Sequence, residues 1–337
     1  MNDILQAIDN AIVAYNDYVG GYALLLLLIP TGIYFMIRLN FLNVRKLGHS
    51  INIIRGKYDK KEDKGDINHF SALTTALSAT VGTGNIVGVA LAIYWGGPGA
   101  VFWMWVTGFL GMILKYVECT LSNKYRKFNS DGTVAGGPMY YMEYGLKDKL
   151  GKFAKVLAII FAAATVICSL GTGNMAQSNS ISDALLTNYS IPHWITGLVL
   201  TLLVLLVIVG GIKRIAKVTS KLVPFMAVLY ILSSLIVIFF NYEDVPQAFY
   251  LIFHDAFSGT AAAGGFVGST FIMTLIWGVR RGLFSNEAGQ GSAAIAHAAA
   301  RTKHPAREGL VASVGPLVDT LIICTLTALL IIVTGAW

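Results

Sequence analysis

The stretch that decides the fold is Ser78-Ala79-Thr80-Val81-Gly82-Thr83-Gly84-Asn85, in the middle of a long apolar segment. Its small and polar residues form a poor continuous helix, because glycine loses the most entropy in a helix and hydroxyl side chains compete for backbone hydrogen bonds. Within a membrane, an unwound backbone persists only where protein buries it or where it lines a polar cavity. The stretch therefore predicts a membrane-spanning helix that is interrupted near its middle. The alternative is a packing face, since Gly84 and Gly88 form a Gly-x-x-x-Gly pair.

The distribution of lysine and arginine indicates that the chain crosses a membrane several times. All 25 of these residues fall within residues 38–64, 115–155, 213–221 and 280–307, and two apolar stretches separate each cluster from the next. Basic residues near the ends of spans are retained on the cytoplasmic side. A soluble protein has no physical reason to sort its cations in this way. We therefore expect a multi-pass plasma-membrane protein with cytoplasmic basic loops and an extracellular N-terminus.

The composition supports the same class of protein. Charged residues make up 13% of the chain and apolar residues 55%, whereas a soluble domain carries about 25% charged residues. Cytoplasmic loops account for the net charge of +7, so the excess of basic residues does not indicate nucleic acid. The lipid bilayer is the partner that the composition predicts.

Eight apolar segments are long enough to span the hydrocarbon core, for which roughly 20 residues are needed. They lie at about residues 20–38, 71–95, 99–122, 154–178, 194–211, 222–240, 262–284 and 308–334. The fold class that we expect is therefore an all-α polytopic membrane protein. The basic loops that face the cytoplasm are then residues 39–68, 123–153, 212–221 and 285–307.

A second interruption is expected in the seventh segment, at Thr274-Leu275-Ile276-Trp277-Gly278. The second and seventh segments lie five spans apart and cross in opposite directions. Discontinuous helices in such positions are typical of inverted-repeat transporters, which bind the substrate between the two breaks. In the second segment, free N–H groups near 84–88 suit a carboxylate, and free carbonyl groups near 79–81 suit a cation. The alternative for the seventh segment is an ordinary helix end with snorkelling arginines.

Three motifs resemble those of the alanine/glycine:cation symporter family. They are Gly82-Thr83-Gly84-Asn85-Ile86, Gly96-Gly97-Pro98-Gly99-Ala100-Val101-Phe102-Trp103-Met104-Trp105 and Arg281-Gly282-Leu283-Phe284-Ser285-Asn286-Glu287-Ala288-Gly289-Gln290-Gly291-Ser292. The resemblance implies sodium-coupled import of alanine or glycine by alternating access, with Na+ as the co-transported ion and no organic cofactor. It also implies an inverted-repeat fold of the leucine-transporter (LeuT) type. The chain is then a secondary active transporter and not an enzyme.

The resemblance implies a division of the chain into four parts. Residues 1–38 are an extra N-terminal helix, 39–70 a cytoplasmic basic loop, 71–240 the first five-helix repeat and 241–337 the first two helices of the inverted repeat. The second repeat is incomplete in this reading, because three core helices have no counterpart before Trp337. The alternative function is therefore a truncated, inactive or partner-dependent fragment of such a transporter.

The residues expected to bind a small neutral amino acid and Na+ follow from the two breaks. We expect the substrate carboxylate to bind the N–H groups of Thr83, Gly84 and Asn85. The substrate ammonium is expected near Thr274, Leu275 and Gly278, and the Na+ ion at Thr80, Val81 and Asn85. Asn174 and Gln177 of the fourth segment are candidates to line the route, with interhelical hydrogen bonding as the alternative.

The ionisable residues argue against an intramembrane hydrolase. Such an enzyme needs paired aspartates, a Ser–His pair or an H-E-x-x-H helix, whereas Asp319 is the one acid well inside an apolar segment. Asp319 is a candidate functional residue, and the alternative is a structural role beside Pro316. His254, His297 and His304 are expected in solvated loops, and Glu118 and Glu287 at the cytoplasmic rim. A channel is disfavoured because two different breaks in one chain indicate a carrier.

Overall fold

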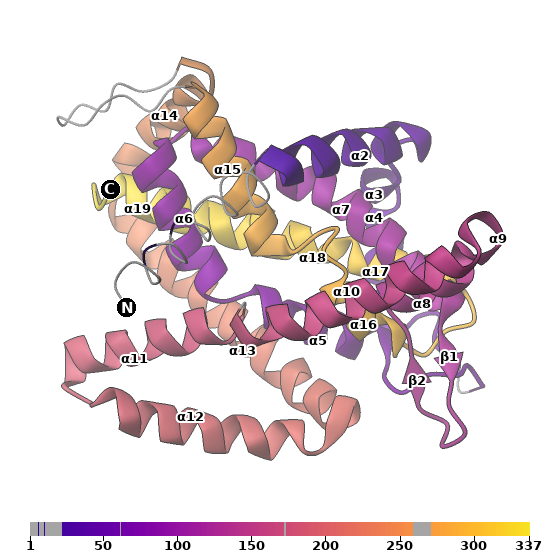
Figure 1. The fold of residues 1–337 in the computed structure, drawn as a ribbon. Coiled ribbons are helices and arrows are strands. Elements are labelled where there is room, and N and C mark those ends of the chain that lie inside the picture. Colours follow the sequence, from indigo (N-terminus) through magenta and orange to yellow (C-terminus); the bar gives the residue numbers. More distant parts are fainter. Residues whose placement is uncertain (1–5, 7–9, 11–21, 61, 172, 259–270) are drawn as a thin grey trace.

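The structure is a computed structural model of residues 1–337, and it describes residues 6, 10, 22–60, 62–171, 173–258 and 271–337. The described part of the chain is almost entirely helical (Figure 1). Its first half contains α2 Leu24–Arg38, α3 Leu42–Arg45, α4 Leu47–Ile54, α5 His69–Thr80, α6 Thr83–Gly96, α7 Ala100–Tyr125, α8 Pro138–Gly145, α9 Lys147–Leu150 and α10 Lys152–Gly171. A short hairpin between α7 and α8 pairs β1 Lys127–Phe128 antiparallel with β2 Val134–Ala135.

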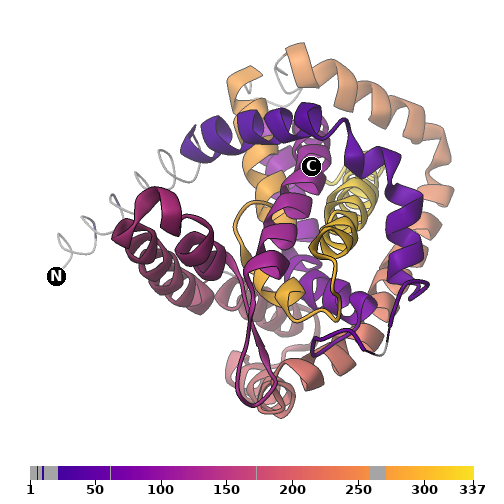
Figure 2. The same ribbon diagram turned by 90° about the vertical axis from the view of Figure 1, so that its right-hand side faces the viewer.

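The second half of the chain continues the helical architecture. It contains α11 Met175–Tyr189, α12 His193–Ile208, α13 Gly211–Phe240, the 3-10 helix η2 Tyr242–Asp244, α14 Val245–Ser258, α15 Phe271–Asn286, α16 Ser292–Ala298, α17 Pro305–Ala312, α18 Val314–Pro316, the π-helix η3 Leu317–Cys324 and α19 Thr325–Val333. The consecutive elements α17, α18, η3 and α19 lie among the other helices of the bundle (Figure 2). Their residues contact α5, α7 and α13. Helices α11 and α12 extend from one side of this bundle (Figure 1).

Several helices have the length and apolarity that a membrane span needs. Within the described residues these are Ala100–Tyr125, Lys152–Tyr189, Gly211–Phe240 and Pro305–Val333, and the bent pair α5–α6 makes a fifth candidate. Large apolar side chains are exposed along α12 and α13, as bilayer contact requires. The expectation of a helical, polytopic membrane protein is therefore confirmed. The first part of the predicted segment 262–284 lies outside the described residues.

The beginning of α13 corrects one predicted boundary. The basic stretch 212–221 was expected to be a loop, but α13 begins at Gly211 and runs through it. Lysine and arginine are good helix formers, and no proline interrupts this stretch before Pro224. The basic side chains of this cluster are therefore arranged with helical periodicity.

Helix α7 is the centre of the bundle, and α2, α14, α15, α16 and α17 all pack on it. Glycine makes the closest of these contacts possible. An added methyl group at Gly278 would overlap the Ala100 carbonyl oxygen and approach the Trp103 Cβ to 2.6 Å, and one at Gly282 would overlap Thr107. The α15 backbone therefore lies directly against α7, and α7 in turn determines where the end of α15 lies.

Candidate functional site

The interruption predicted in the second segment is confirmed. Helix α5 ends at Thr80 and α6 begins at Thr83, with a bend of 43° between them. The two residues between the helices are extended, with φ −76° and ψ 101° at Val81 and φ −178° and ψ −136° at Gly82. The small and polar composition of this stretch thus leads to a true break instead of a continuous helix with a small-residue face.

Among the described residues, two N–H groups at the α6 N-terminus have no acceptor within their own helix. Gly82 N–H donates to the Asn85 side-chain oxygen at 2.9 Å, and Asn85 N–H donates to the Gly82 carbonyl oxygen at 3.1 Å. The N–H groups of Thr83 and Gly84 belong to the first turn, so they have no acceptor within their own helix. These two groups are therefore available to an anion at the positive end of α6.

A small hollow adjoins the break and brings together several of the predicted site residues. It has a volume of about 10 Å³ and is lined by Ala79, Thr80, Thr83, Gly84, Gly173, Ala176, Gln177, Phe284 and Glu287. The Gln177 amide lies against the break, since an added methyl group at Gly82 would be 3.1 Å from its oxygen. A space of this size holds about one water molecule, so no amino acid fits without rearrangement.

A larger cavity lies on another side of the same break. It has a volume of about 290 Å³, and its lining comes from the break, from α13 and from η3: Val81, Gly82, Asn85, Ile86, Met226, Leu229, Tyr230, Ser233 and Ile323. The predicted ion ligands Val81 and Asn85 face this cavity, whereas Thr80 faces the small hollow. The structure therefore divides the predicted residues between two adjoining spaces.

Asp319 is joined directly to the break. The Asn85 side-chain amide donates to the Asp319 carboxylate, and also to the Asp319 carbonyl oxygen at 3.0 Å. The other carboxylate oxygen accepts from Ser285 Oγ at 3.0 Å and from Thr320 Oγ1 at 3.2 Å. Asp319 and Thr320 are fully buried, and both belong to η3. π-Helical turns are rare and occur frequently at functional sites.

The predicted interruption at 274–278 is wrong. Helix α15 is continuous from Phe271 to Asn286, and Thr274 Oγ1 donates to the Gly96 carbonyl oxygen at 2.7 Å. Helices α6 and α15 are antiparallel neighbours, so Thr274 and Leu275 lie at the end of α6 that is remote from its break. Gly278 is needed for close packing on α7 and not for unwinding.

The second break comes later, between α15 and α16. Glu287, Gly289 and Gly291 all have positive φ, at 51°, 82° and 85°. Gly84 faces this end of α15, since an added methyl group there would be 3.5 Å from the Ser285 Cα. Helix α6 packs on α15, and α5 packs on α16. The two interrupted helices therefore lie side by side with their breaks adjacent.

At each break, an asparagine side chain accepts a backbone N–H group. The sequence analysis did not identify the second of these residues, Asn286, as part of the site. Asn286 Oδ1 accepts the Ala288 N–H group at 2.9 Å, just as Asn85 Oδ1 accepts that of Gly82. The Asn286 amide donates to Thr320 Oγ1 at 3.2 Å, beside the contact of Asn85 with Asp319. The signal was present in the run of small and polar residues at 285–292, which resembles that at 78–85.

Asn174 and Gln177 have different positions. Gln177 lines the small hollow, whereas Asn174 is exposed at the start of α11, where its carbonyl oxygen accepts from Ser178 Oγ at 3.0 Å. Asn174 precedes the first residue of α11, and Gln177 lies three positions later, within that helix. The structure thus brings Gln177, but not Asn174, to the break.

His297, predicted in a loop, and Glu118, predicted at the cytoplasmic rim, are both buried. His297 was expected to be solvated, but it is 1% exposed, and its Nδ1 lies 2.5 Å from Glu308 Oε1. The other Glu308 oxygen bonds His69 at the start of α5, so one buried carboxylate joins α5, α16 and α17. Glu118 is also buried, where it accepts the Gly291 N–H group at 3.1 Å. His254 and His304 are exposed, as expected, but His254 lies within helix α14 and not in a loop.

The Arg126 side chain binds the backbone of the segment that follows α16. Its guanidinium donates to four carbonyl oxygens, those of Lys64, Ala298, Ala300 and Thr302, at 2.5–3.0 Å. Burial lowers the pKa of this guanidinium from its usual value, but arginine remains charged in proteins. The contact fixes the end of α16, and therefore one side of the second break, to the β1–β2 hairpin.

Comparison of the sequence with known proteins shows which family and which relatives the chain is similar to. The profile of the sodium:alanine symporter family matches residues 5–337. The sodium/alanine symporter AgcS of Methanococcus maripaludis is 46% identical over 320 residues, which cover 95% of this chain and 69% of that protein. The putative sodium/proton-dependent alanine carrier protein YrbD of Bacillus subtilis is 43% identical over 311 residues, or 92% of this chain and 61% of that protein. The probable sodium/glutamine symporter GlnT of the same organism is 40% identical over 335 residues, or 98% of this chain and 67% of that protein.

Proposed function

Because the chain belongs to the sodium:alanine symporter family, and so is a membrane transporter and not an enzyme, we propose that it couples Na+ entry to uptake of alanine or glycine. The proposed location is the plasma membrane, with the basic loops in the cytoplasm. The proposed fold is the LeuT-type inverted repeat. It is supported by the two interrupted helices, α5–α6 and α15–α16, which pack side by side with adjacent breaks.

The observation that carries the proposal is the pairing of opposite helix ends at the breaks. The N-terminus of α6 and the C-terminus of α15 meet where Gly84 faces Ser285. A helix N-terminus carries a partial positive charge and a helix C-terminus a partial negative charge. A zwitterion that binds here directs its carboxylate at the N–H groups of Thr83 and Gly84. Its ammonium faces the last carbonyl groups of α15, which replace Thr274, Leu275 and Gly278 in this role.

Na+ binds, in this proposal, at the C-terminal end of α5. Thr80 and Val81 carry the last carbonyl groups of that helix, and Asn85 lies one turn beyond the break. Asp319 adds the negative charge, through the buried cluster that it forms with Asn85 and Ser285. An ionisable residue within a membrane protein's core is expensive to bury, and it is therefore a functional candidate.

Substrate entry requires the small hollow to open. Its present volume of about 10 Å³ excludes an amino acid, and the Gln177 side chain both lines it and approaches Gly82. Movement of α11 away from the break enlarges this space, and closure returns the protein to the compact form. Rocking of the α5–α6 and α15–α16 pairs against the other helices then alternates access to the site.

The direct test is uptake of radiolabelled alanine by proteoliposomes that contain the purified chain. We expect uptake to saturate with alanine, to require an inward Na+ gradient and to rise with an inside-negative potential, because a neutral substrate moves with one or more cations. Glycine should compete with alanine. Uptake that is independent of both Na+ and proton gradients would contradict the coupling, and non-saturating flux would favour a channel.

A further inference from the structure

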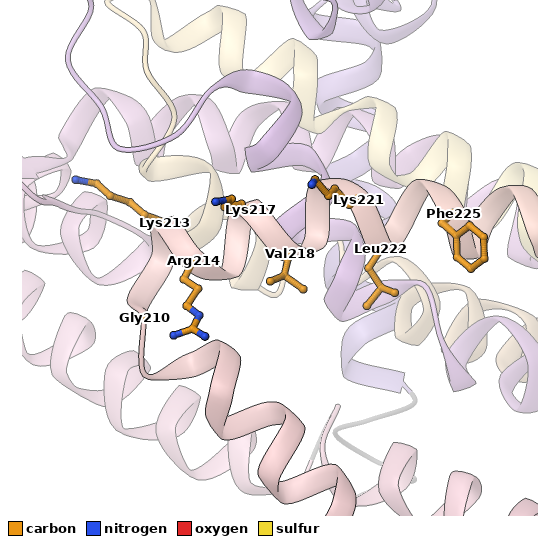
Figure 3. A pocket seen from close by; sticks show the side chains of 8 residues that line it. All are labelled: Gly210, Lys213, Arg214, Lys217, Val218, Lys221, Leu222 and Phe225. Atoms are coloured by element: carbon orange, nitrogen blue, oxygen red, sulfur yellow. The ribbon is translucent and has the colours of Figure 1, made fainter.

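A further cavity, which is basic, lies at the start of α13, before the residues of the same helix that line the break cavity. It has a volume of about 860 Å³ and is lined by Gly210, Lys213, Arg214, Lys217, Val218, Lys221, Leu222 and Phe225 (Figure 3). We call it the α13 basic groove. Half of its lining residues are cations, and the apolar ones continue along the helix toward its membrane-spanning part.

The three lysines and the apolar residues occupy adjoining faces of the helix. Lys213, Lys217 and Lys221 are spaced by four residues and lie along one side in Figure 3. Arg214 points to the other side, toward the turn that joins α12 to α13, and Val218 and Leu222 follow it along the same face (Figure 3). The groove therefore has a cationic part near the start of α13 and an apolar part further along the same helix.

The position of Arg214 depends on a glycine. An added methyl group at Gly210 would overlap the Arg214 side chain, so its aliphatic part lies directly over the Gly210 backbone. Gly211 has a φ of 65°, which an L side chain rarely adopts. The turn before α13 thus places the Arg214 side chain against Gly210 in the lining of the groove.

Most of this positive charge is not neutralised within the described part of the chain. Lys213 Nζ lies 3.5 Å from Asp66, and it is 68% exposed. Among the described residues, no carboxylate lies within 4.0 Å of the basic groups of Arg214, Lys217 or Lys221. The groove is therefore complementary to an anion.

The apolar extension indicates which kind of anion fits. Beyond Lys221, α13 presents Leu222, Phe225, Val228 and Leu229 to its surroundings, and Gly211–Phe240 is long enough to cross a membrane. The cations therefore lie where a span meets the headgroup region. We propose that the α13 basic groove binds an anionic membrane phospholipid, with its phosphate at Arg214, Lys217 and Lys221 and an acyl chain along Leu222 and Phe225.

The test measures lipid binding by the delipidated full chain in detergent, with phosphatidylglycerol and phosphatidylcholine as probes in native mass spectrometry. Each basic residue near an anionic headgroup contributes roughly a factor of five, so R214Q/K217Q/K221Q should weaken phosphatidylglycerol binding at least tenfold. Phosphatidylcholine should bind weakly to both proteins. A variant that keeps the wild-type affinity for phosphatidylglycerol overturns the proposal.

Three controls separate this site from general charge effects. K147Q/K149Q/K152Q removes the same charge from exposed residues at α9 and the start of α10, and it should change binding less than twofold. The charge-preserving variant R214K/K217R/K221R should bind phosphatidylglycerol as the wild type does, and R214Q/K217Q/K221Q should keep the wild-type melting temperature, which excludes misfolding as the cause. Inorganic phosphate at millimolar concentration should not displace the lipid. An equal loss in the first control, or displacement by phosphate, contradicts a phospholipid site.

Discussion

The side-chain amide of Asn85 bonds both the carboxylate and the backbone carbonyl oxygen of Asp319, and so joins the α5–α6 break to the π-helix η3. Ser285 of α15 bonds the same carboxylate at 3.0 Å. One buried acid therefore connects both interrupted helices to a third element. A change in charge at Asp319 acts on all three at once, which makes it the most informative position to test.

Asp319→Asn should raise the Na+ concentration for half-maximal alanine uptake by tenfold or more. The amide retains hydrogen-bonding capacity toward Ser285 but removes the negative charge that we propose for the ion site. The measurement is the Na+ dependence of uptake in proteoliposomes, with D244N in the exposed η2 helix as the control. An unchanged Na+ dependence would exclude Asp319 from the ion site.

Asn85→Ala should lower the thermal stability as well as uptake. The variant leaves the Gly82 N–H group without its acceptor and removes a donor from the buried Asp319. A buried polar group that loses its partner costs about 1–3 kcal/mol. The melting temperature in detergent should therefore fall, whereas N129A, which changes an exposed residue of the β1–β2 turn, should leave it unchanged.

Gln177→Ala should alter alanine affinity but not Na+ affinity. Gln177 lines the small hollow together with Thr83 and Gly84, and its amide approaches Gly82. Loss of one hydrogen-bonding group corresponds to about 1 kcal/mol, or a fivefold rise in KM. Kinetics with N174A provide the matched control, since Asn174 is an exposed residue that directly precedes α11. A larger effect from N174A than from Q177A would reverse our assignment.

Gly278→Ala should destabilise the protein through packing alone. The added methyl group overlaps the Ala100 carbonyl oxygen, so α15 must move away from α7. Overpacking of this kind costs about 1–3 kcal/mol. The comparison is with G197A in α12, where an added methyl group has no neighbour within 4 Å. If G278A and G197A melted at the same temperature, the close contact of α15 with α7 would be in doubt.

Glu308→Ala should be among the most destabilising single changes on the cytoplasmic side of our proposed topology. It leaves His69 and His297 buried without the carboxylate that joins them. Removing one partner of a buried charged pair costs about 3–5 kcal/mol. Protease resistance of the folded protein is a suitable measurement, because His69 begins α5 and its release frees that helix. E243A in η2 serves as the exposed control and should remain as resistant as the wild type.

The sequence by itself determined the class of the protein and the first break. Clustered cations and long apolar segments follow from the cost of burying charge in lipid, so they are visible without coordinates. The break at Val81 and Gly82 is likewise local, because glycines and hydroxyl residues in succession weaken a helix wherever it packs. The boundary of α13 at Gly211 was missed because basic residues suit a helix end as well as a loop.

Only the tertiary structure decided which residues meet at that break. Thr274 and Gly278 have the composition of an unwound segment, yet the antiparallel pairing of α15 with α6 carries them to the remote end of α6. The same pairing brings Ser285 and Asn286 to the break, and the course of η3 brings Asp319 to Asn85. These partners are separated by about 200 residues or more in the chain. Local composition therefore signals where a helix can open, but the packing of distant helices determines what the opening faces.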